Sequence, residues 1–416
     1  MSSPKLQAPR GTYDVLPDDA ARREAVEDAA RRILGAAGYR RIETPAFEAT
    51  ELFARGVGSS TDVVQKEMYS FDDGGGRSMT LRPEGTAPVC RAYVEHGMHK
   101  WAQPVRLWYL SSFFRHEAPQ AGRYRQFWQV GAEALGSSDP ALDAESILLL
   151  AELLAALGVR DVRLRLSSLG RPETRAAYRE ELQTYLRAHE ERLSEEVRNR
   201  IDVNPLRAFD ADHPGTREVM AGAPRLLDRL DPDDAEHFAA VRALLDDAGI
   251  AYEVDPTLVR GLDYYARTVF EFTSDALGAQ SGVGGGGRYD GLVEQLGGPA
   301  TPGMGWAAGI ERMVLASTGQ PLIAPVVDLF VAYATPEGQR RGFRLARDAR
   351  QAGLAAQVEL AGRSLKGQLK QADRVRARFV AILGDEGATL KDMESGEQDE
   401  LAADAVIASV LRGRTI

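Results

Sequence analysis

The chain has little cysteine and no long hydrophobic run. Cys90 is the single cysteine among 416 residues, which excludes an internal disulfide and any metal site built from several cysteines. No apolar stretch is long enough to cross a membrane, and the first residues, MSSPKLQAPRGTYD, contain no apolar signal core. We therefore expect a protein of the reducing cytoplasm with no membrane association.

Several common catalytic motifs are also missing. The sequence contains neither a GxxxxGK[ST] phosphate loop nor a GxSxG nucleophile elbow. GVGGGG at 282–287 fits GxGxxG formally, but its surroundings favour a β hairpin and no acidic residue follows at the spacing of a dinucleotide site. His96 and His99 have the spacing HxxH without a third ligand nearby, which favours an exposed helical pair over a metal site.

Length and charge limit the remaining possibilities. A chain of 416 residues is too long for one compact core, so we expect two or three domains. The net charge of −10, from 51 basic and 61 acidic residues, argues by itself against a nucleic-acid partner. Residues 340–378, however, contain 11 basic and 3 acidic residues, enough to attract phosphates. The same run is also compatible with a solvated helix face.

The apolar pattern divides the chain into regions. It predicts a helix from Asp18, acting as a cap, to Gly38, with an apolar stripe at Ala21, Ala25, Ala29, Ile33 and Ala37. The pattern further predicts a hairpin of strands 105–115 and 125–135, a helix at 141–157, a helical insertion at 171–250, strands at 252–272 and 282–287, and a helix at 305–317. After a boundary near Pro325, strands and helices alternate as in βαβα units.

Two groups of polar residues lie in the first half of this pattern. Glu84 and Thr86 flank a glycine just before an expected helix. In the hairpin, Arg115 ends one strand, and Gln129 and Glu133 share one face of the other because side chains repeat every two residues along a strand. Gly131 separates the two and leaves room for a small ligand to lie flat against that face.

Two further groups follow later in the chain. In RGLDYYARTVFEF, Arg260 and the pair Tyr264 and Tyr265 stand at the start of the predicted strand. In GMGWAAGIERM, small residues permit close backbone approach, and Arg312 lies at the start of a helix. Each of these residues alone also has an ordinary reading as a surface ion pair or as packing with the polar end at the rim. Together, the arginines suit a phosphoryl centre, and the carboxylates and amide suit an ammonium group.

With these residues in place, the chain resembles the histidyl-tRNA synthetases, which are class II aminoacyl-tRNA synthetases. The similarity begins at PRGTYDVLP, and ETPAFEATELFARGVG, FRHEAPQAGRYRQFWQVGAE and GMGWAAGIERMVLA resemble motifs 1, 2 and 3 of that class. LVRGLDYYARTVFEF and GGGRYDGL resemble the two signatures of the histidine enzymes. Five matches in the right order are far more specific than motif 3 alone.

The resemblance implies an α/β fold. It implies a catalytic domain with a mainly antiparallel sheet in residues 1–170 and 251–322, a helical insertion in 171–250 and an α/β anticodon-binding domain in 326–416. The implied activity joins histidine to ATP with Mg²⁺, giving histidyl-adenylate and pyrophosphate, and then transfers histidine to the 3′ end of its tRNA. Motif 1 further implies a homodimer. No editing domain is evident.

The resemblance also implies roles for the polar residues. Glu84, Thr86 and Gln129 would hold the α-amino group of histidine, and Glu133 with Tyr264 or Tyr265 would hold the imidazole. These partners suit a ring that is near neutral at pH 7 and offers both a donor and an acceptor.

The resemblance also implies that the arginines bind the nucleotide. Arg115 and Arg123 would bind ATP, with Arg115 at the α-phosphate, and Arg312 would bind the outer phosphates. Arg260 would stabilise the charge on the reacting carboxylate and α-phosphate, so Arg260 and Arg115 are the expected catalytic residues. No metal ligand of the protein is assigned.

Two departures and two alternatives accompany this interpretation. Trp128 stands where many relatives have histidine and Ala132 where cysteine is common. Both alternate with Gln129 and Glu133, so we expect them to face away from the ligand.

Regulatory paralogues share this catalytic domain, bind histidine and charge no tRNA, but typically lack the anticodon-binding domain and part of the ATP and histidine motifs. A non-catalytic RNA-binding protein with a degenerate core is the remaining alternative.

Overall fold

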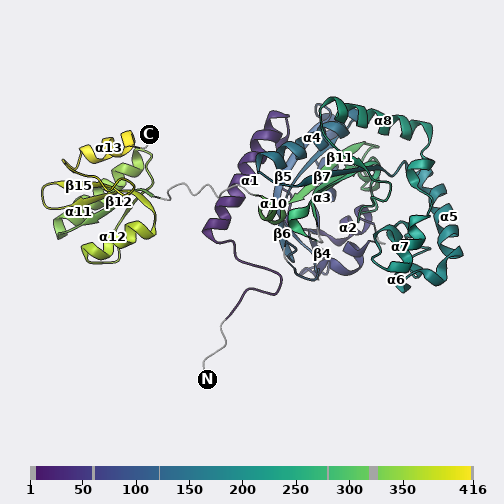
Figure 1. The fold of residues 1–416 in the computed structure, drawn as a ribbon, viewed down its shortest axis with the longest axis horizontal. Coiled ribbons are helices and arrows are strands. Elements are labelled where there is room, and N and C mark those ends of the chain that lie inside the picture. The colour runs from purple at the N-terminus through teal and green to yellow at the C-terminus, as the bar shows by residue number, and fades with distance from the viewer. Residues whose placement is uncertain (1–5, 59–60, 121, 279–280, 318–326, 414–416) are drawn as a thin grey trace, which may run out of the picture. The chain divides into compact units, whose positions relative to one another are not determined.

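The structure is a computed structural model that describes residues 6–58, 61–120, 122–278, 281–317 and 327–413. The chain divides into two compact units, Met1–Gly319 and Gln320–Ile416, and each is described by itself (Figure 1). The boundary expected near Pro325 lies outside the described residues. No helix of the described residues combines the length and the apolar character that crossing a membrane requires.

The elements follow one another in this order. The helices are α1 Pro17–Ala36, α2 Thr50–Gly56, α3 Thr86–Glu95, α4 Pro140–Ala156, α5 Pro172–Ala188, α6 Glu195–Arg198, α7 Pro214–Ala221, α8 Pro232–Asp247, α9 Leu292–Gln295, α10 Ile310–Ala316, α11 Pro336–Gln351, α12 Leu365–Arg374 and α13 Ala405–Gly413. The strands are β1 Arg40–Arg41, β2 Phe47–Ala49, β3 Tyr69–Asp72, β4 Ser78–Leu81, β5 Val105–Phe114, β6 Gln126–Leu135, β7 Val162–Ser168, β8 Glu253–Val254, β9 Ala266–Ser274, β10 Gly282–Arg288, β11 Gly303–Gly309, β12 Val327–Tyr333, β13 Ala356–Val358, β14 Ala377–Leu383, β15 Ala388–Asp392 and β16 Gln398–Leu401.

The larger unit is built on one sheet with the strand order β1-β5-β6-β11-β10-β9-β7-β8. Every pair from β5 to β7 is antiparallel, and only the short edge strands β1 and β8 pair in parallel. The expected hairpin is confirmed as β5 and β6, with Tyr109 opposite Gly131. The mainly antiparallel sheet and the α/β class are therefore as the sequence predicts.

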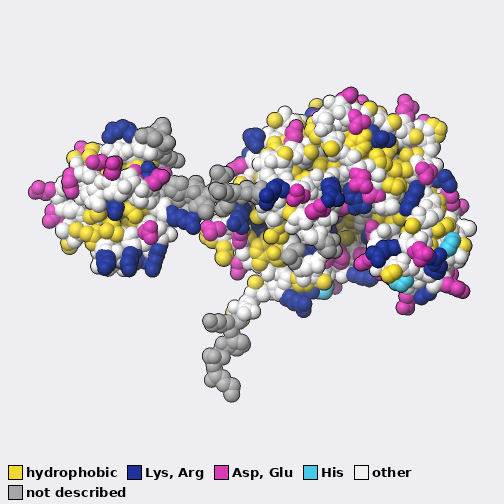
Figure 2. Space-filling model, viewed as in Figure 1, with side chains coloured by type: hydrophobic (Ala, Val, Ile, Leu, Met, Phe, Trp, Pro, Cys, Tyr) yellow, Lys and Arg dark blue, Asp and Glu magenta, His cyan; other side chains and the backbone are white. Residues whose placement is uncertain are grey.

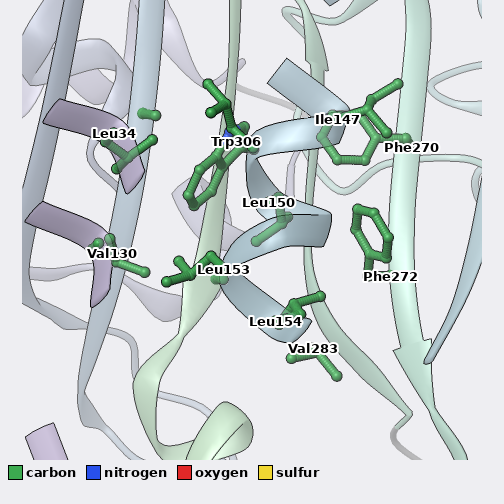
Figure 3. Packing of buried hydrophobic residues seen from close by; sticks show 14 of the residues in the cluster. Leu34, Val130, Ile147, Leu150, Leu153, Leu154, Phe270, Phe272, Val283 and Trp306 are labelled. Atoms are coloured by element: carbon green, nitrogen blue, oxygen red, sulfur yellow. The ribbon is translucent and has the colours of Figure 1, made fainter. Parts of the chain in front are cut away.

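One face of this sheet carries the main hydrophobic core. Val130 of β6, Trp306 of β11 and Phe270 of β9 pack there against Leu150 and Leu153 of α4 (Figure 3). Helices α1, α8 and α10 contribute to the same core. Because side chains alternate along a strand, the neighbours of these apolar residues point to the opposite face, where the polar groups collect.

The opposite face is covered by α3, α9 and part of the segment between α5 and α7. Val89, Tyr93 and Tyr289 belong to a core between α3 and the sheet. A further core joins Tyr178 and Leu182 of α5 to Tyr265. The segment with α5 to α7 thus packs directly on the chain that leads into β9, whereas α8 packs on α4 in the main core.

The smaller unit is an α/β domain. Its sheet has the order β13-β12-β14-β15-β16, with β13, β12 and β14 parallel and the last two strands antiparallel. Helix α11 packs on one face and α12 on the other. The predicted alternation is confirmed up to β14, but the hairpin of β15 and β16 was not predicted.

The start of α1 differs from the sequence prediction. The helix begins at Pro17 with Leu16 as its cap, so Asp18 lies in the first turn and is not the cap. The buried stripe is formed by Val26, Ala29, Ala30 and Leu34, of which the prediction contained only Ala29. Proline suits a first helical position because its missing N–H would have no partner there.

Two later predictions about strands and helices need correction. Residues Gly303–Gly309 form β11, and only Ile310–Ala316 are helical, although a helix was expected from 305. β11 lies between β6 and β10, and a Cβ on Gly286 would meet the carbonyl oxygen of Gly305 at 1.9 Å. Small residues there serve close strand packing. Similarly, β9 begins at Ala266, so Arg260 and the two tyrosines lie in the loop before the strand.

Candidate active site

A cavity of about 190 Å³ opens on the polar face of the main sheet. Its walls come from the start of α3, from β5 and β6, from β10 and β11, and from the loop before β9. The lining residues are Val63, Glu84, Gly85, Thr86, Tyr109, Arg115, Gln129, Arg260, Gly261, Leu262, Tyr264, Tyr265, Gly285, Trp306 and Ala307. Acidic, amide, phenolic and guanidinium groups thus converge on one small space.

Glu84 lies at the N-terminus of α3. Its carboxylate accepts the backbone N–H of Thr86 at 2.7 Å and that of Ala87 at 2.9 Å, so it satisfies two amides at the start of the helix. Tyr264 donates its hydroxyl to the same carboxylate at 3.5 Å. Burial raises the pKa of Glu84, and the two backbone hydrogen bonds partly oppose this. A cation in the cavity would favour the ionised form.

Glu133 lies behind the cavity wall and has no exposed surface. Its oxygens accept three hydroxyl groups, from Thr86 at 2.8 Å, Tyr289 at 2.6 Å and Tyr109 at 3.3 Å. Burial raises the pKa of Glu133 to about 8, because none of these hydrogen-bond partners is charged.

Gly131 leaves room on β6, but the space is filled by the protein itself. A Cβ on Gly131 would meet the Tyr109 ring at 2.3 Å, and one on Gly85 would meet it at 2.4 Å. The expectation that Gly131 makes room for a ligand is therefore wrong. The glycine makes room for a tyrosine that supports Glu133.

The loop before β9 brings Arg260 and the tyrosine pair to the cavity. Arg260 donates from Nη1 to Glu271 at 3.0 Å, and its guanidinium lies 6.0 Å from the centre of the Tyr265 ring. Its buried Nε has no hydrogen-bond partner among the described residues. The rings of Tyr264 and Tyr265 are 4.7 Å apart. Arg260 thus lines the cavity as a guanidinium held by Glu271.

The same loop is fastened to α5. Arg175 donates from Nη1 to the backbone carbonyl of Tyr265 at 2.6 Å. Tyr265 is buried in the core that α5 forms with this loop. The segment between α5 and α7 therefore contributes directly to the position of the cavity wall.

Arg115 follows β5 and reaches the cavity from the hairpin. It donates from Nε to the carbonyl of Pro83 at 2.8 Å and lies over the ring of Phe127 at 5.3 Å. Glu117 lies 3.8 Å from Arg115 and 3.1 Å from Arg123. One carboxylate thus balances two arginines of the hairpin loop.

Arg312 lies in the first turn of α10, beside β10. Its Nε donates to the carbonyl of Gly282. Burial, and to a lesser degree the charge of Arg123, lower the pKa of Arg312. Neither Arg312 nor Arg123 is among the residues that line the cavity.

The structure brings most of the expected site residues together. Glu84, Thr86, Gln129, Arg115, Arg260, Tyr264 and Tyr265 line the cavity. Glu133 stands behind its wall, and Arg123 and Arg312 stand at the hairpin loop and α10. Trp128 and Ala132 pack in the main core on the opposite face, as expected.

Sequence reasoning missed the residues that support this set. Tyr109 could have been found from the hairpin register, which places it opposite Gly131. Tyr289 lies in the quoted string GGGRYDGL without having been singled out. Glu271, the partner of Arg260, had no signal beyond the strand pattern.

Metal ligands are sparse among the described residues. They contain no group of three or more His, Cys, Asp or Glu side chains that could hold a metal ion. A second cavity of about 190 Å³ lies between Asp62 and the segment with α6, but its charges are matched within the protein: Arg200 binds Asp62 at 2.8 Å and Arg207 binds Asp210 at 3.0 Å.

Comparisons with known proteins agree with this architecture. Residues 11–313 match the family model described as histidyl-tRNA synthetase, and residues 326–412 match an anticodon binding domain. A histidine–tRNA ligase of Halorhodospira halophila is 51% identical over 424 residues, covering 99% of each chain. The structure of an S. aureus histidyl-tRNA synthetase without ligands has a TM-score of 0.82 at 34% identity, covering 98% of this chain and 100% of that one.

A more distant structure shares the fold only. It is described as an ATP phosphoribosyltransferase regulatory subunit/histidyl-tRNA synthetase from Bacillus halodurans, with a TM-score of 0.67 at 22% identity over 92% of this chain and 99% of that one. The family model and the full-length relative decide the assignment. The chain belongs to the histidyl-tRNA synthetase family.

Proposed function

We propose that this chain is a histidine–tRNA ligase. In the first step, a carboxylate oxygen of histidine forms a bond to the α-phosphorus of ATP, and the bond to the β-phosphate oxygen breaks, releasing pyrophosphate. In the second step, a ribose hydroxyl at the 3′ end of the tRNA attacks the acyl carbon, AMP leaves, and the hydroxyl proton passes to solvent. The observation that carries the proposal is the convergence of Glu84, Gln129, Arg115 and Arg260 on one cavity.

Histidine binds at the acidic end of this cavity. Glu84, Thr86 and Gln129 hold the α-ammonium group, for which the buried Glu84 carboxylate supplies the countercharge. Glu133 and a tyrosine of the pair Tyr264 and Tyr265 read the imidazole. Since the pKa of Glu133 is about 8, this group is mainly a neutral acid at pH 7 and can donate to a ring nitrogen. For this, Thr86 or Tyr109 has to give up its hydrogen bond to the Glu133 oxygen that the two hydroxyl groups share.

A site that hydrogen-bonds both ring nitrogens discriminates strongly. An analogue lacking them leaves buried polar groups without partners, which typically costs roughly 10⁴ in specificity. Such selectivity is consistent with a chain in which no editing domain is evident.

ATP binds at the arginines. Arg115 holds the α-phosphate, Arg123 and Arg312 hold the outer phosphates, and Arg260 stabilises the charge that the reacting carboxylate and α-phosphate share. The position of Arg260 in the cavity wall, fixed by Glu271, supports this role, because a preorganised cation acts without reorganisation during the reaction.

Mg²⁺ fits this site as an ion carried by the nucleotide. The carboxylates nearest the arginines are already paired, Glu271 with Arg260 and Glu117 with Arg123, and no cluster of three ligands exists among the described residues. Such a set suits an ion held mainly by phosphate oxygens and water, with Glu271 as the protein carboxylate beside it. The ion would neutralise charge on the outer phosphates.

The smaller unit supplies a surface for the tRNA. Lys366, Lys370 and Arg374 are exposed and spaced four residues apart along α12, so they share one helix face. Figure 2 shows basic side chains side by side at this edge of the unit. We propose that residues 326–416 bind the anticodon region and that 171–250, inserted between the two catalytic segments 1–170 and 251–322, faces the tRNA.

We further propose a cytoplasmic homodimer. Phe47 and Phe71 are exposed on the sheet of β2, β4 and β3, with their rings 6.0 Å apart. A second copy would cover this apolar surface. Sedimentation of a species with the mass of one chain would contradict the dimer.

The regulatory alternative is weaker. Arg115, Arg260 and Arg312 are all present, and the chain carries the anticodon-binding domain. The deciding experiment is ATP–pyrophosphate exchange with each of the twenty amino acids, followed by charging of tRNA. Exchange with histidine alone, together with charged tRNA, is the expected result. Histidine binding without exchange would favour the regulatory role and overturn the ligase.

A further inference from the structure

Residues 9–13 form a turn that lies against the hairpin loop of residues 115–125. Thr12 closes the turn with its backbone N–H and hydroxyl on the carbonyl of Pro9, at 3.0 and 2.8 Å. The backbone N–H of Arg125 donates to the carbonyl of Gly11 at 2.7 Å. Gly11 has φ +85°, and a Cβ there would meet the Arg125 side chain at 2.8 Å. Only glycine allows this close approach.

Tyr13 extends the contact on both sides of the turn. Its ring packs on Tyr124 with the ring centres 4.5 Å apart. Its hydroxyl donates to Glu311 at 2.7 Å, a residue 298 positions away in the sequence. Arg23 of α1 donates to both the Tyr13 hydroxyl and the Glu311 carboxylate, at 2.9 and 3.1 Å.

Glu311 gathers donors from three separate segments. Besides Tyr13 and Arg23, the backbone N–H of Trp128 lies 3.1 Å from both carboxylate oxygens. Arg23 also lies over the Trp128 ring at 4.5 Å. The side chains of Arg23 and Glu311 are only 16% and 9% exposed, so solvent screens their interaction weakly.

This cluster is joined to Arg312 on one side and to the hairpin loop that follows Arg115 on the other. Glu311 precedes Arg312 in the first turn of α10, so fixing one carboxylate fixes the turn that carries the arginine. The carbonyl of Arg125 accepts the backbone N–H of Arg115 at 3.0 Å. Yet Tyr13, Arg23 and Glu311 do not line the cavity.

We propose that Tyr13, Arg23 and Glu311 are positioning residues that hold Arg312 and the hairpin loop in the geometry that binds ATP. The inference rests on the proposed function. Binding groups held by hydrogen bonds from several segments lose effectiveness when displaced by a fraction of an ångström. The cluster lies at the nucleotide end of the site, so its loss should affect ATP and leave histidine binding unchanged.

The test measures KM separately for ATP and histidine in pyrophosphate exchange. Tyr13→Phe removes one hydroxyl and should raise KM for ATP by roughly three- to tenfold, the range of the net contribution of a typical single hydrogen bond. KM for histidine should stay within about twofold of the parent value. In a Tyr13→Phe, Glu311→Gln double variant, the two effects should not add, because Tyr13 acts through Glu311.

Tyr185→Phe is the matched control. It removes a half-buried hydroxyl that donates to the carbonyl of Val219 at 2.8 Å, in the segment between α5 and α7. It should lose similar stability in thermal unfolding without changing KM for ATP. Equal changes in both KM values, additive effects or an unchanged KM for ATP in Tyr13→Phe would each overturn the inference. A wild-type chain without histidine-dependent exchange would instead overturn the proposed function, and the inference with it.

Discussion

Two carboxyl groups with no exposed surface, Glu133 and Asp143, belong to opposite sides of the same sheet. Glu133 accepts only hydroxyl groups, and burial raises its pKa to about 8. Asp143 of α4 accepts Arg288 Nε at 3.0 Å and His237 Nε2 at 2.8 Å. Burial would raise the pKa of Asp143, but the hydrogen bond from His237 and the charge of Arg288 outweigh it and hold that pKa below its usual range.

The difference separates a carboxylate paired with charged groups from one that has neutral partners only. Asp143 has its countercharge within the protein, so the cost of burying its charge is offset in the folded chain without a ligand. Glu133 lies behind the cavity wall with neutral partners only, and under the proposed function the imidazole of histidine supplies its further partner. The following predictions test this contrast.

The largest effect should come from Asp143→Ala. The substitution leaves the buried guanidinium of Arg288 without its main partner, so the free energy of unfolding should fall by about 3–5 kcal/mol. Urea unfolding measures the change. Glu133→Gln is the comparison and should unfold close to the parent at pH 7, because it replaces a neutral group with a neutral group. Similar losses in both variants would remove the contrast.

Arg260→Ala should come next and should act on chemistry. Losing a preorganised contact to the developing charge should lower the adenylation rate by about 10². Single-turnover formation of histidyl-adenylate measures the rate, and pyrophosphate exchange gives a second readout. Arg165→Ala is the control, because Arg165 also pairs with Glu271, at 3.4 Å, but does not line the cavity. Near-normal exchange in Arg260→Ala would contradict the catalytic role.

The two carboxyl groups should also differ in the sign of their pH dependence. Because the pKa of Glu133 rises from 4.5 to about 8 on folding, the unfolded chain releases this proton first. As the pH rises between these two pKa values, Glu133 therefore lowers the free energy of unfolding by about 1.4 kcal/mol for each pH unit. Glu133→Gln should remove this slope. Asp143 contributes in the opposite direction, since its lowered pKa means that stability is lost at acid pH. Unfolding titrations of the parent and Glu133→Gln from pH 5 to 8 would decide, and identical slopes would refute the assignment.

The smallest effect should distinguish the tyrosine pair. Removing a hydroxyl that meets the imidazole should raise KM for histidine by roughly three- to tenfold and leave KM for ATP unchanged. Tyr264→Phe and Tyr265→Phe serve as each other's control, because the two rings are 4.7 Å apart in the same loop. If neither variant changes KM for histidine, the imidazole is not read by this pair.

The sequence predicts elements whose signal is local. Alternating apolar residues and a polar loop specify the hairpin of β5 and β6, and the period of two places Gln129 and Glu133 on the face opposite Trp128 and Ala132. The most specific site residues, Arg260 and the tyrosine pair, came from resemblance to a family and not from physical pattern alone. Their strand was extended too far because tyrosine and valine both have high strand propensity.

Partners that are far apart in sequence leave no such signal. Arg288 and Asp143 are 145 residues apart, and Tyr13 and Glu311 are 298 apart. Asp143 lies in a helix that also contains Glu145 and Glu152, and nothing near it in the sequence indicates a buried guanidinium partner. β11 gave the opposite difficulty, because its alanines run directly into the helical residues of α10 and only the neighbouring strands require residues 303–309 to be extended.

The bond from Arg175 to the Tyr265 carbonyl links α5 directly to the loop that forms the cavity wall. One end belongs to α5, in the segment proposed to face the tRNA, and the other to a residue of the proposed histidine pocket. Any factor by which a macromolecule bound at α5 changes the affinity for histidine must equal the factor by which histidine changes the affinity for that macromolecule. A substitution of Arg175 that weakens such a coupling would therefore weaken it equally in both directions.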